Sequence, residues 1–159
     1  MRVLVAPDAF AGAMSAVEAA RAVREGWLRR APGDEVDLAP MSGGGPGFVD
    51  VLHATLGGDL LARTVRGPFG DPVPASLLVL DGRDDGRTAY VEAAQACGLH
   101  LTDGEGGERA TSYGVGELLA AAVDAVGPAG EVVVGLGALG VNDGGAGLLA
   151  ALGATADRP

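Results

Sequence analysis

Gly135-Leu-Gly-Ala-Leu-Gly-Val-Asn-Asp-Gly-Gly-Ala-Gly147 is the stretch that decides the fold. An aliphatic run, residues 131–136, predicts a buried strand before it, and an apolar run, residues 146–152, predicts a helix after it. Such a glycine turn can bind phosphate or carboxylate, because the helix N-terminus offers free N–H groups and glycine lets a ligand approach the backbone. Asn142 and Asp143 stand where an N-cap or a polar ligand contact would be. A tight turn capped by Asp143, without a ligand, explains the pattern equally well.

The composition predicts one ordinary domain with an aliphatic core. Hydrophobic residues make up 48% of the 159 residues and aromatic residues only 4%, so valine, leucine and alanine must fill the interior. The mean hydropathy is +0.27. The 28 glycines cluster instead of repeating, which favours functional loops over linkers.

The charge pattern excludes several functions. The formal net charge is −10 and no basic face is evident, so we expect no nucleic-acid partner. All 11 basic residues are arginines, which excludes chemistry based on a Schiff-base or P-loop lysine. Cys97 is the only cysteine, and His53 and His100 have no partners at metal-ligand spacing, so the residues predict no metal ligands. With no signal-peptide pattern and no membrane-spanning apolar run, we expect a cytoplasmic protein without membrane contact.

The first third of the chain predicts a βαβα arrangement. Residues 2–6 and 34–39 are typical of strands, and residues 48–56 are typical of a helix. Ser15 and Glu18 have the spacing of a capping box, which predicts a helix start between the two strands. This order favours a parallel sheet with crossover helices.

The pattern changes near Gly67, where we predict a domain boundary. Residues 1–66 form the βαβα half-domain, and residues 67–159 form a mixed α/β unit that contains the Tyr113 and Asn142–Asp143 loops. The next strands are expected at residues 60–66, 73–80 and 87–91, with turns at 67–72 and 81–86 between them. Helices are expected at residues 92–96 and 115–126, and Thr111 or Ser112 caps the second of them. The second turn is typical of a hairpin.

Four features are candidate site elements, and each has a structural alternative. Asp8 follows the first strand and is a ligand contact, a general base or a turn residue. Glu92 ends a strand and is either a functional carboxylate or a first-turn glutamate. Tyr113 offers a hydroxyl or packs near a helix start. The triple glycine 43–45 is an anion nest or a flexible crossover loop.

Five segments, in order, resemble the bacterial glycerate kinase family. The opening Val-Leu-Val-Ala-Pro-Asp8-Ala-Phe-Ala-Gly12 is similar to the family's Ala-Pro-Asp-Ser-Phe-Lys-Gly-Ser. The other segments are Met41-Ser-Gly-Gly-Gly-Pro-Gly47, Glu92-Ala-Ala-Gln-Ala-Cys-Gly-Leu99, Thr111-Ser-Tyr-Gly-Val-Gly-Glu-Leu118 and Asn142-Asp-Gly-Gly-Ala-Gly147. The resemblance is to the N-terminal portion of the class I, glycerate 2-kinase type.

The resemblance implies a fold and a reaction. The family has two α/β domains around a cleft, so this α/β chain would be a flavodoxin-like half plus the start of a second α/β domain, with a parallel or mixed sheet and flanking helices. The family transfers the γ-phosphoryl group of ATP to a hydroxyl of glycerate, with Mg²⁺. Asp8 would be the catalytic residue. Substrate and phosphate would bind at Gly12, Gly44, Gly45, Gly47, Glu92, Tyr113, Asn142, Asp143, Gly144 and Gly145.

The chain departs from the family pattern at reactive positions. Ala11 replaces the family lysine, alanines 9 and 13 replace serines, and Gly43 and Pro46 replace an aspartate and a glutamate. These changes give the alternative of a catalytically impaired relative that binds a small acid or nucleotide, or regulates a partner chain. Because a shortened fold exposes apolar edges, we expect a homo-oligomer or a companion chain.

Overall fold

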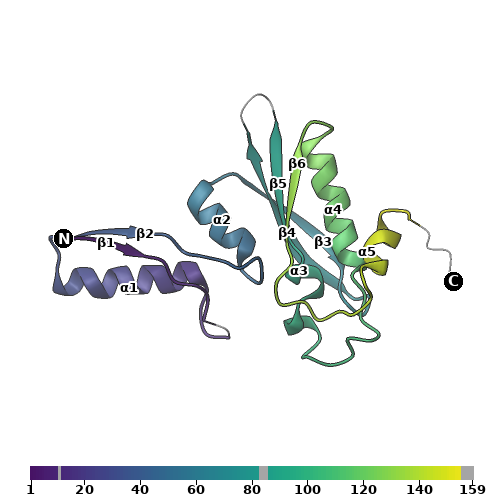
Figure 1. Ribbon diagram of the computed structural model, residues 1–159, viewed down its shortest axis with the longest axis horizontal. Coiled ribbons are helices and arrows are strands. Elements are labelled where there is room, and N and C mark those ends of the chain that lie inside the picture. Colours follow the sequence, from purple (N-terminus) through teal and green to yellow (C-terminus); the bar gives the residue numbers. More distant parts are fainter. Residues whose placement is uncertain (11, 83–85, 155–159) are drawn as a thin grey trace.

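The computed structural model describes residues 1–10, 12–82 and 86–154, and its elements follow the predicted order (Figure 1). The strands are β1 Arg2–Val5, β2 Glu35–Leu38, β3 Asp59–Arg66, β4 Pro72–Asp81, β5 Arg87–Glu92 and β6 Glu131–Gly135. The helices are α1 Ala16–Arg30, α2 Phe48–Leu56, α3 Ala94–Cys97, α4 Tyr113–Val126 and α5 Ala146–Ala151, with a 3₁₀ turn at Leu99–Leu101.

The strands form two sheets in the described ranges. β1 and β2 pair in parallel, and α1 packs against them. The second sheet has the order β3-β4-β5-β6, in which the first three strands are antiparallel and β6 is parallel to β5. The predicted α/β class, with parallel and mixed sheets flanked by helices, is confirmed.

Helix α1 begins at the predicted capping box. The Glu18 N–H donates to Ser15 Oγ at 3.2 Å, and the Ser15 N–H donates to a Glu18 carboxylate oxygen at 2.8 Å. Both groups would otherwise lack a partner at the helix start. The same hydrogen bonds hold the pKa of the Glu18 carboxyl below its ordinary value.

The four-stranded sheet lies between helices α2 and α4 (Figure 1). Leu77 and Leu78 are adjacent on β4, so their side chains point to opposite faces of the sheet, and both are fully buried. Leu77 packs with Val91 and Leu118 in the core beneath α4. Burial of both faces explains why the middle of β4 is continuously apolar instead of alternating.

Several boundaries differ slightly from prediction. Helix α4 begins at Tyr113 because Ser112 occupies the N-cap position, and α3 begins later because Glu92 is the last residue of β5. β4 and β5 pair as the predicted hairpin, although residues 83–85 of its turn lie outside the described residues. The domain boundary at residue 67 stays a prediction; β3, which precedes it, pairs with β4 along its whole length. None of the helices described has the length and apolarity required to cross a membrane.

Candidate functional site

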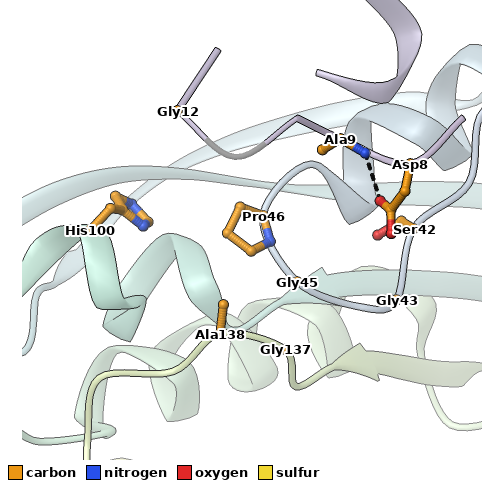
Figure 2. Close-up of a pocket in the computed structure, with 10 residues that line it drawn as sticks. All are labelled: Asp8, Ala9, Gly12, Ser42, Gly43, Gly45, Pro46, His100, Gly137 and Ala138. Atoms are coloured by element: carbon orange, nitrogen blue, oxygen red, sulfur yellow. Dashed lines mark hydrogen bonds between the residues drawn. The ribbon is translucent and has the colours of Figure 1, made fainter. Parts of the chain in front are cut away.

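A cleft of about 510 Å³ opens between loops that follow three strands. These loops come after β1, β2 and β6, and the turn after α3 completes the wall (Figure 2). The lining residues are Asp8, Ala9, Gly12, Ser42, Gly43, Gly45, Pro46, His100, Gly137 and Ala138. Ligands of open α/β sheets bind outside the carboxyl ends of the strands, and this cleft has that location.

The cleft brings together three of the predicted site residues, Asp8, Gly12 and Gly45. The Asp8 carboxylate accepts a hydrogen bond from the Ala9 N–H at 2.7 Å, and Asp8 is drawn next to Ser42 in Figure 2. Among the described lining residues, Asp8 and His100 carry the ionisable side chains. The cleft is therefore built mainly of backbone, with a carboxylate and an imidazole at its rim.

The floor of the cleft is a direct backbone contact between two glycine loops. The Gly137 N–H donates to the Gly44 carbonyl at 2.8 Å. A Cβ on Gly137 would lie 2.6 Å from both the N and the Cα of Gly45. A Cβ on Gly135 would lie 2.6 Å from the Gly44 carbonyl oxygen. Only residues without side chains allow this approach, so the glycines at these positions have a packing role.

The Glu92 carboxylate anchors the end of the glycine loop that precedes α2. Its side chain is only 5% exposed, and its carboxylate oxygens accept hydrogen bonds from the N–H groups of Gly47 and Val49, each at 3.2 Å. Gly47 is the left-handed N-cap of α2, with φ +88°. Burial raises the pKa of the Glu92 carboxyl, assisted by the charge of Asp50. Glu92 is thus a remote cap for α2 and does not line the cleft.

His100 and Ala138 line the cleft, although sequence reasoning selected neither. A Cβ on Gly98 would lie 2.7 Å from the Nδ1 and Cε1 atoms of His100, so the absence of a side chain at Gly98 leaves room for the imidazole. Ala138 has φ +54°, and its carbonyl accepts a hydrogen bond from the Leu99 N–H at 2.9 Å. A left-handed alanine is unusual, and this bond ties it to the turn that carries His100. No pattern in the sequence marks either residue.

Asp143 organises a second cluster, between the starts of α4 and α5. Its carboxylate accepts from the N–H and Oγ of Ser112, both at 2.8 Å, and from the N–H groups of Gly145 and Gly147, both at 3.1 Å. Burial disfavours its charge, but these hydrogen bonds outweigh that effect and hold the pKa of the carboxyl below its ordinary value. Asp143 caps α5 with its side chain, while left-handed Gly145 occupies the N-cap position.

The remaining predicted residues lie around this cluster. The Asn142 N–H donates to the Gly107 carbonyl at 3.2 Å, and Gly144 is left-handed with φ +61°. Tyr113 lines a separate cavity, where the Arg66 guanidinium carbon lies 4.2 Å from the centre of its ring. The structure therefore divides the predicted site residues between the cleft, its supporting loop and the Asp143 cluster. Their roles in binding stay predictions.

The cleft has donors for an anion. The N–H groups of Gly43 and Gly45 donate no hydrogen bond to any described residue, and the Ser42 Oγ accepts from the Gly44 N–H at 3.2 Å. Within the described residues, no three His, Cys, Asp or Glu side chains gather closely enough to form a metal cage. Magnesium in phosphoryl-transfer sites needs only one or two carboxylates together with substrate phosphates, and Asp8 offers one.

Comparison with known proteins assigns the chain to a family. The sequence matches the glycerate kinase family over residues 3–158. The chain belongs to the glycerate kinase family. This assignment confirms the resemblance carried by the five segments.

Relatives of this glycerate kinase family chain are longer than it is. The glycerate kinase of Bacillus subtilis is 40% identical over 155 residues, which cover 96% of this chain and 39% of the relative. An uncharacterized Mycobacterium bovis protein is 49% identical over 157 residues, covering 96% and 40%. A crystal structure of a Salmonella typhimurium LT2 protein assigned as glycerate kinase 2 matches with a TM-score of 0.73 and 32% identity, covering 96% of this chain and 40% of that one. The chain thus spans about 40% of the length of these relatives.

Replacing Gly137 with alanine tests the glycine contact. Gly137→Ala should lower the free energy of unfolding by about 1–3 kcal/mol, because the added methyl group collides with backbone that has no side chain to move aside. Gly43→Ala is the matched control, since a Cβ there meets nothing within 4 Å, and it should be neutral or slightly stabilising. Urea unfolding followed by circular dichroism measures both, and equal stability of the two variants would contradict the contact.

Glu92 should give the stability a recognisable pH dependence. Because its folded-state pKa lies above the ordinary value, the folded protein binds this proton more tightly than the unfolded chain does. Its contribution to the free energy of unfolding therefore increases as the pH falls from 7 toward 4.5. Relative to Glu92→Gln, the wild type should gain stability over this range, whereas a Glu131→Gln control should follow the wild type. Parallel pH profiles for wild type and Glu92→Gln would refute a raised pKa of Glu92 in the folded protein.

Proposed function

We propose that the cleft binds glycerate and that the chain contributes this cleft to an ATP-dependent glycerate kinase. The observation that carries the proposal is the convergence of Asp8, the glycine loop 42–46 and Gly137 on one cleft at the carboxyl ends of strands. Asp8 and residues 42–46 belong to segments that carry the family resemblance, and Gly137 lies in the glycine turn that leads to the last of these segments. Family membership supports the reaction class, and the Bacillus subtilis relative, a glycerate kinase, supports glycerate as substrate.

The cleft residues suit a small hydroxy acid and its phosphorylation. The N–H groups of Gly43 and Gly45 would donate to an anionic oxygen of the ligand, and His100 faces the same space (Figure 2). Asp8 would accept the proton of the glycerate hydroxyl as that oxygen forms its bond to the γ-phosphorus of ATP and the bond from this phosphorus to the bridging oxygen breaks, releasing ADP. Phosphoryl transfer depends mostly on positioning and charge neutralisation, which a rigid glycine floor supports.

The nucleotide and Mg²⁺ are part of the proposal by family membership. Mg²⁺ supplies charge neutralisation at the transferring phosphate when it is bound. Asp8 and Ser42 are the lining residues with oxygen atoms suited to it, and a single carboxylate fits a metal that is otherwise held by substrate phosphates and water. Residues 42–45 would approach the phosphates through their backbone.

A catalytically impaired relative is the second candidate, and the lining of the cleft favours it. Ala9, Gly43 and Pro46 all line the cleft, and each stands where the family pattern has a polar or charged side chain. Ala11, at the position of the family lysine, lies outside the described residues. Losing a cation that contacts phosphate commonly costs orders of magnitude in rate. Such a chain would bind glycerate or a nucleotide, or regulate a partner, without turnover.

We also propose that the protein works in the cytoplasm and associates with another copy or a companion chain. Leu4 on β1 is 67% exposed, and Met1, Val23 and Trp27 leave further apolar surface on the same β1–α1–β2 unit. Exposed apolar patches of this kind mark interaction surfaces. The association would complete the small sheet.

Thermal shift and turnover measurements test the two candidates. Glycerate should raise the melting temperature of the chain, because a ligand that prefers the native state stabilises it. ADP release with ATP, Mg²⁺ and glycerate would support the kinase, and binding without ADP release would support the impaired relative. The absence of any shift with glycerate or ATP–Mg²⁺ would contradict both.

If turnover is present, Asp8→Asn should reduce kcat by at least about 100-fold, which is the usual contribution of general acid–base catalysis. Glycerate should still raise the melting temperature of this variant, because the backbone donors remain. Asp124→Asn, at an exposed position of α4, is the matched control and should retain kcat. Unchanged kcat in Asp8→Asn would exclude Asp8 as the proton acceptor.

A further inference from the structure

We infer that a second cavity, formed by Arg66, Phe69, Arg109 and Tyr113, is a separate binding site for a small ligand that carries a phosphate group. The cavity has a volume of about 440 Å³ and shares no lining residue with the cleft. Arg66 ends β3, Phe69 lies in the turn before β4, and Arg109 and Tyr113 flank the start of α4. This site does not depend on the proposed function of the cleft.

Two guanidinium groups line this cavity with unused donors. Arg66 approaches the Glu117 carboxylate through Nε at 3.3 Å, and Arg109 approaches Glu108 through Nε at 3.8 Å. Neither side chain donates a hydrogen bond to any described residue. Both contacts are made by the inner nitrogen, so the terminal nitrogens at the end of each fork are left for a ligand.

The Tyr113 ring orients one of these groups. The Arg66 guanidinium carbon lies 4.2 Å from the centre of the Tyr113 ring, a cation–π arrangement that orients the planar group. Phe69 Cζ and Arg109 Nη2 lie 3.1 and 3.5 Å from the same point, where a Cβ of Gly106 would be. Phe69 and Arg109 thus both approach Gly106, and the Arg109 side chain is 78% exposed.

The loops that carry the four residues are tied to one another. The Thr111 N–H donates to the Pro68 carbonyl at 2.9 Å, which joins the turn of Phe69 to the segment of Arg109. The Arg66 N–H donates to a Glu117 carboxylate oxygen at 2.8 Å, which joins the end of β3 to α4. The walls of the cavity therefore exist before a ligand arrives, which lowers the entropic cost of binding.

The charge and geometry select a phosphate. The chain as a whole carries a formal net charge of −10, yet two arginines converge here. Planar guanidinium forks match phosphate oxygens through paired hydrogen bonds, and a phosphate carries more charge than one carboxylate. The exposed ring of Phe69 adds a surface on which a nucleobase can stack.

Calorimetric titration with inorganic phosphate, pyrophosphate and AMP, without Mg²⁺, tests the site. The wild type should bind pyrophosphate, and Arg66→Gln and Arg109→Gln should each weaken binding about tenfold or more, as expected for losing a hydrogen bond to a charged group. Arg63→Gln is the matched control: Arg63 is an exposed arginine on the same strand that bonds only to the Ala62 carbonyl among described residues. It should retain the wild-type affinity.

His100→Gln separates this cavity from the cleft. Pyrophosphate affinity should be unchanged in His100→Gln, and circular dichroism should verify that every variant is folded. AMP binding tighter than inorganic phosphate would identify a nucleotide as the source of the phosphate, and equal affinity would identify the phosphate alone; either supports the site. Absence of binding by the wild type, equal weakening by Arg63→Gln, or weakening by His100→Gln but not by the arginine variants would overturn the inference.

Discussion

The contact between the glycine loops of residues 43–47 and 135–140 is the constraint on which the cleft depends. The two backbones meet without side chains between them, and the Gly137 N–H reaches the Gly44 carbonyl at 2.8 Å. This contact joins the loop after β2 to the loop after β6. Strands β2 and β6 belong to different sheets. The contact fixes the floor of the cleft. Because this floor has no side chains, the reactive groups must come from the rim, where Asp8 and His100 lie.

Two carboxylates support this arrangement from outside the cleft. Glu92 caps α2 and Asp143 caps α5, and each helix begins with a left-handed glycine, Gly47 and Gly145. The two acids differ in their protonation behaviour: burial raises the pKa of Glu92, whereas hydrogen bonds lower that of Asp143. Because both carboxylates accept hydrogen bonds from N–H groups at helix starts, both act in this chain as helix caps. Their place in family motifs is consistent with a need to hold the glycine loops rigidly.

The sequence predicted most of the fold because local patterns determined it. The Ser15 capping box, the apolar strands and the glycine stops required no knowledge of distant contacts. The cleft was predicted less well. Asp8 and Gly45 follow strands and could be expected at a sheet edge, but His100 reaches the cleft through tertiary hydrogen bonds between the loop after β6 and the turn after α3, that of left-handed Ala138 among them. The role of Glu92 depends on a helix 45 residues away.

The exchange rate of the Gly137 amide proton tests the central claim most directly. The account predicts that this proton exchanges with solvent slowly, at a rate near that of buried Val91, because its hydrogen bond to Gly44 opens only with the packed loops. The Gly43 amide, which has no partner among the described residues, should exchange rapidly. Rapid exchange at Gly137, matching that at Gly43, would show that the loops do not hold each other, and would contradict a preformed cleft.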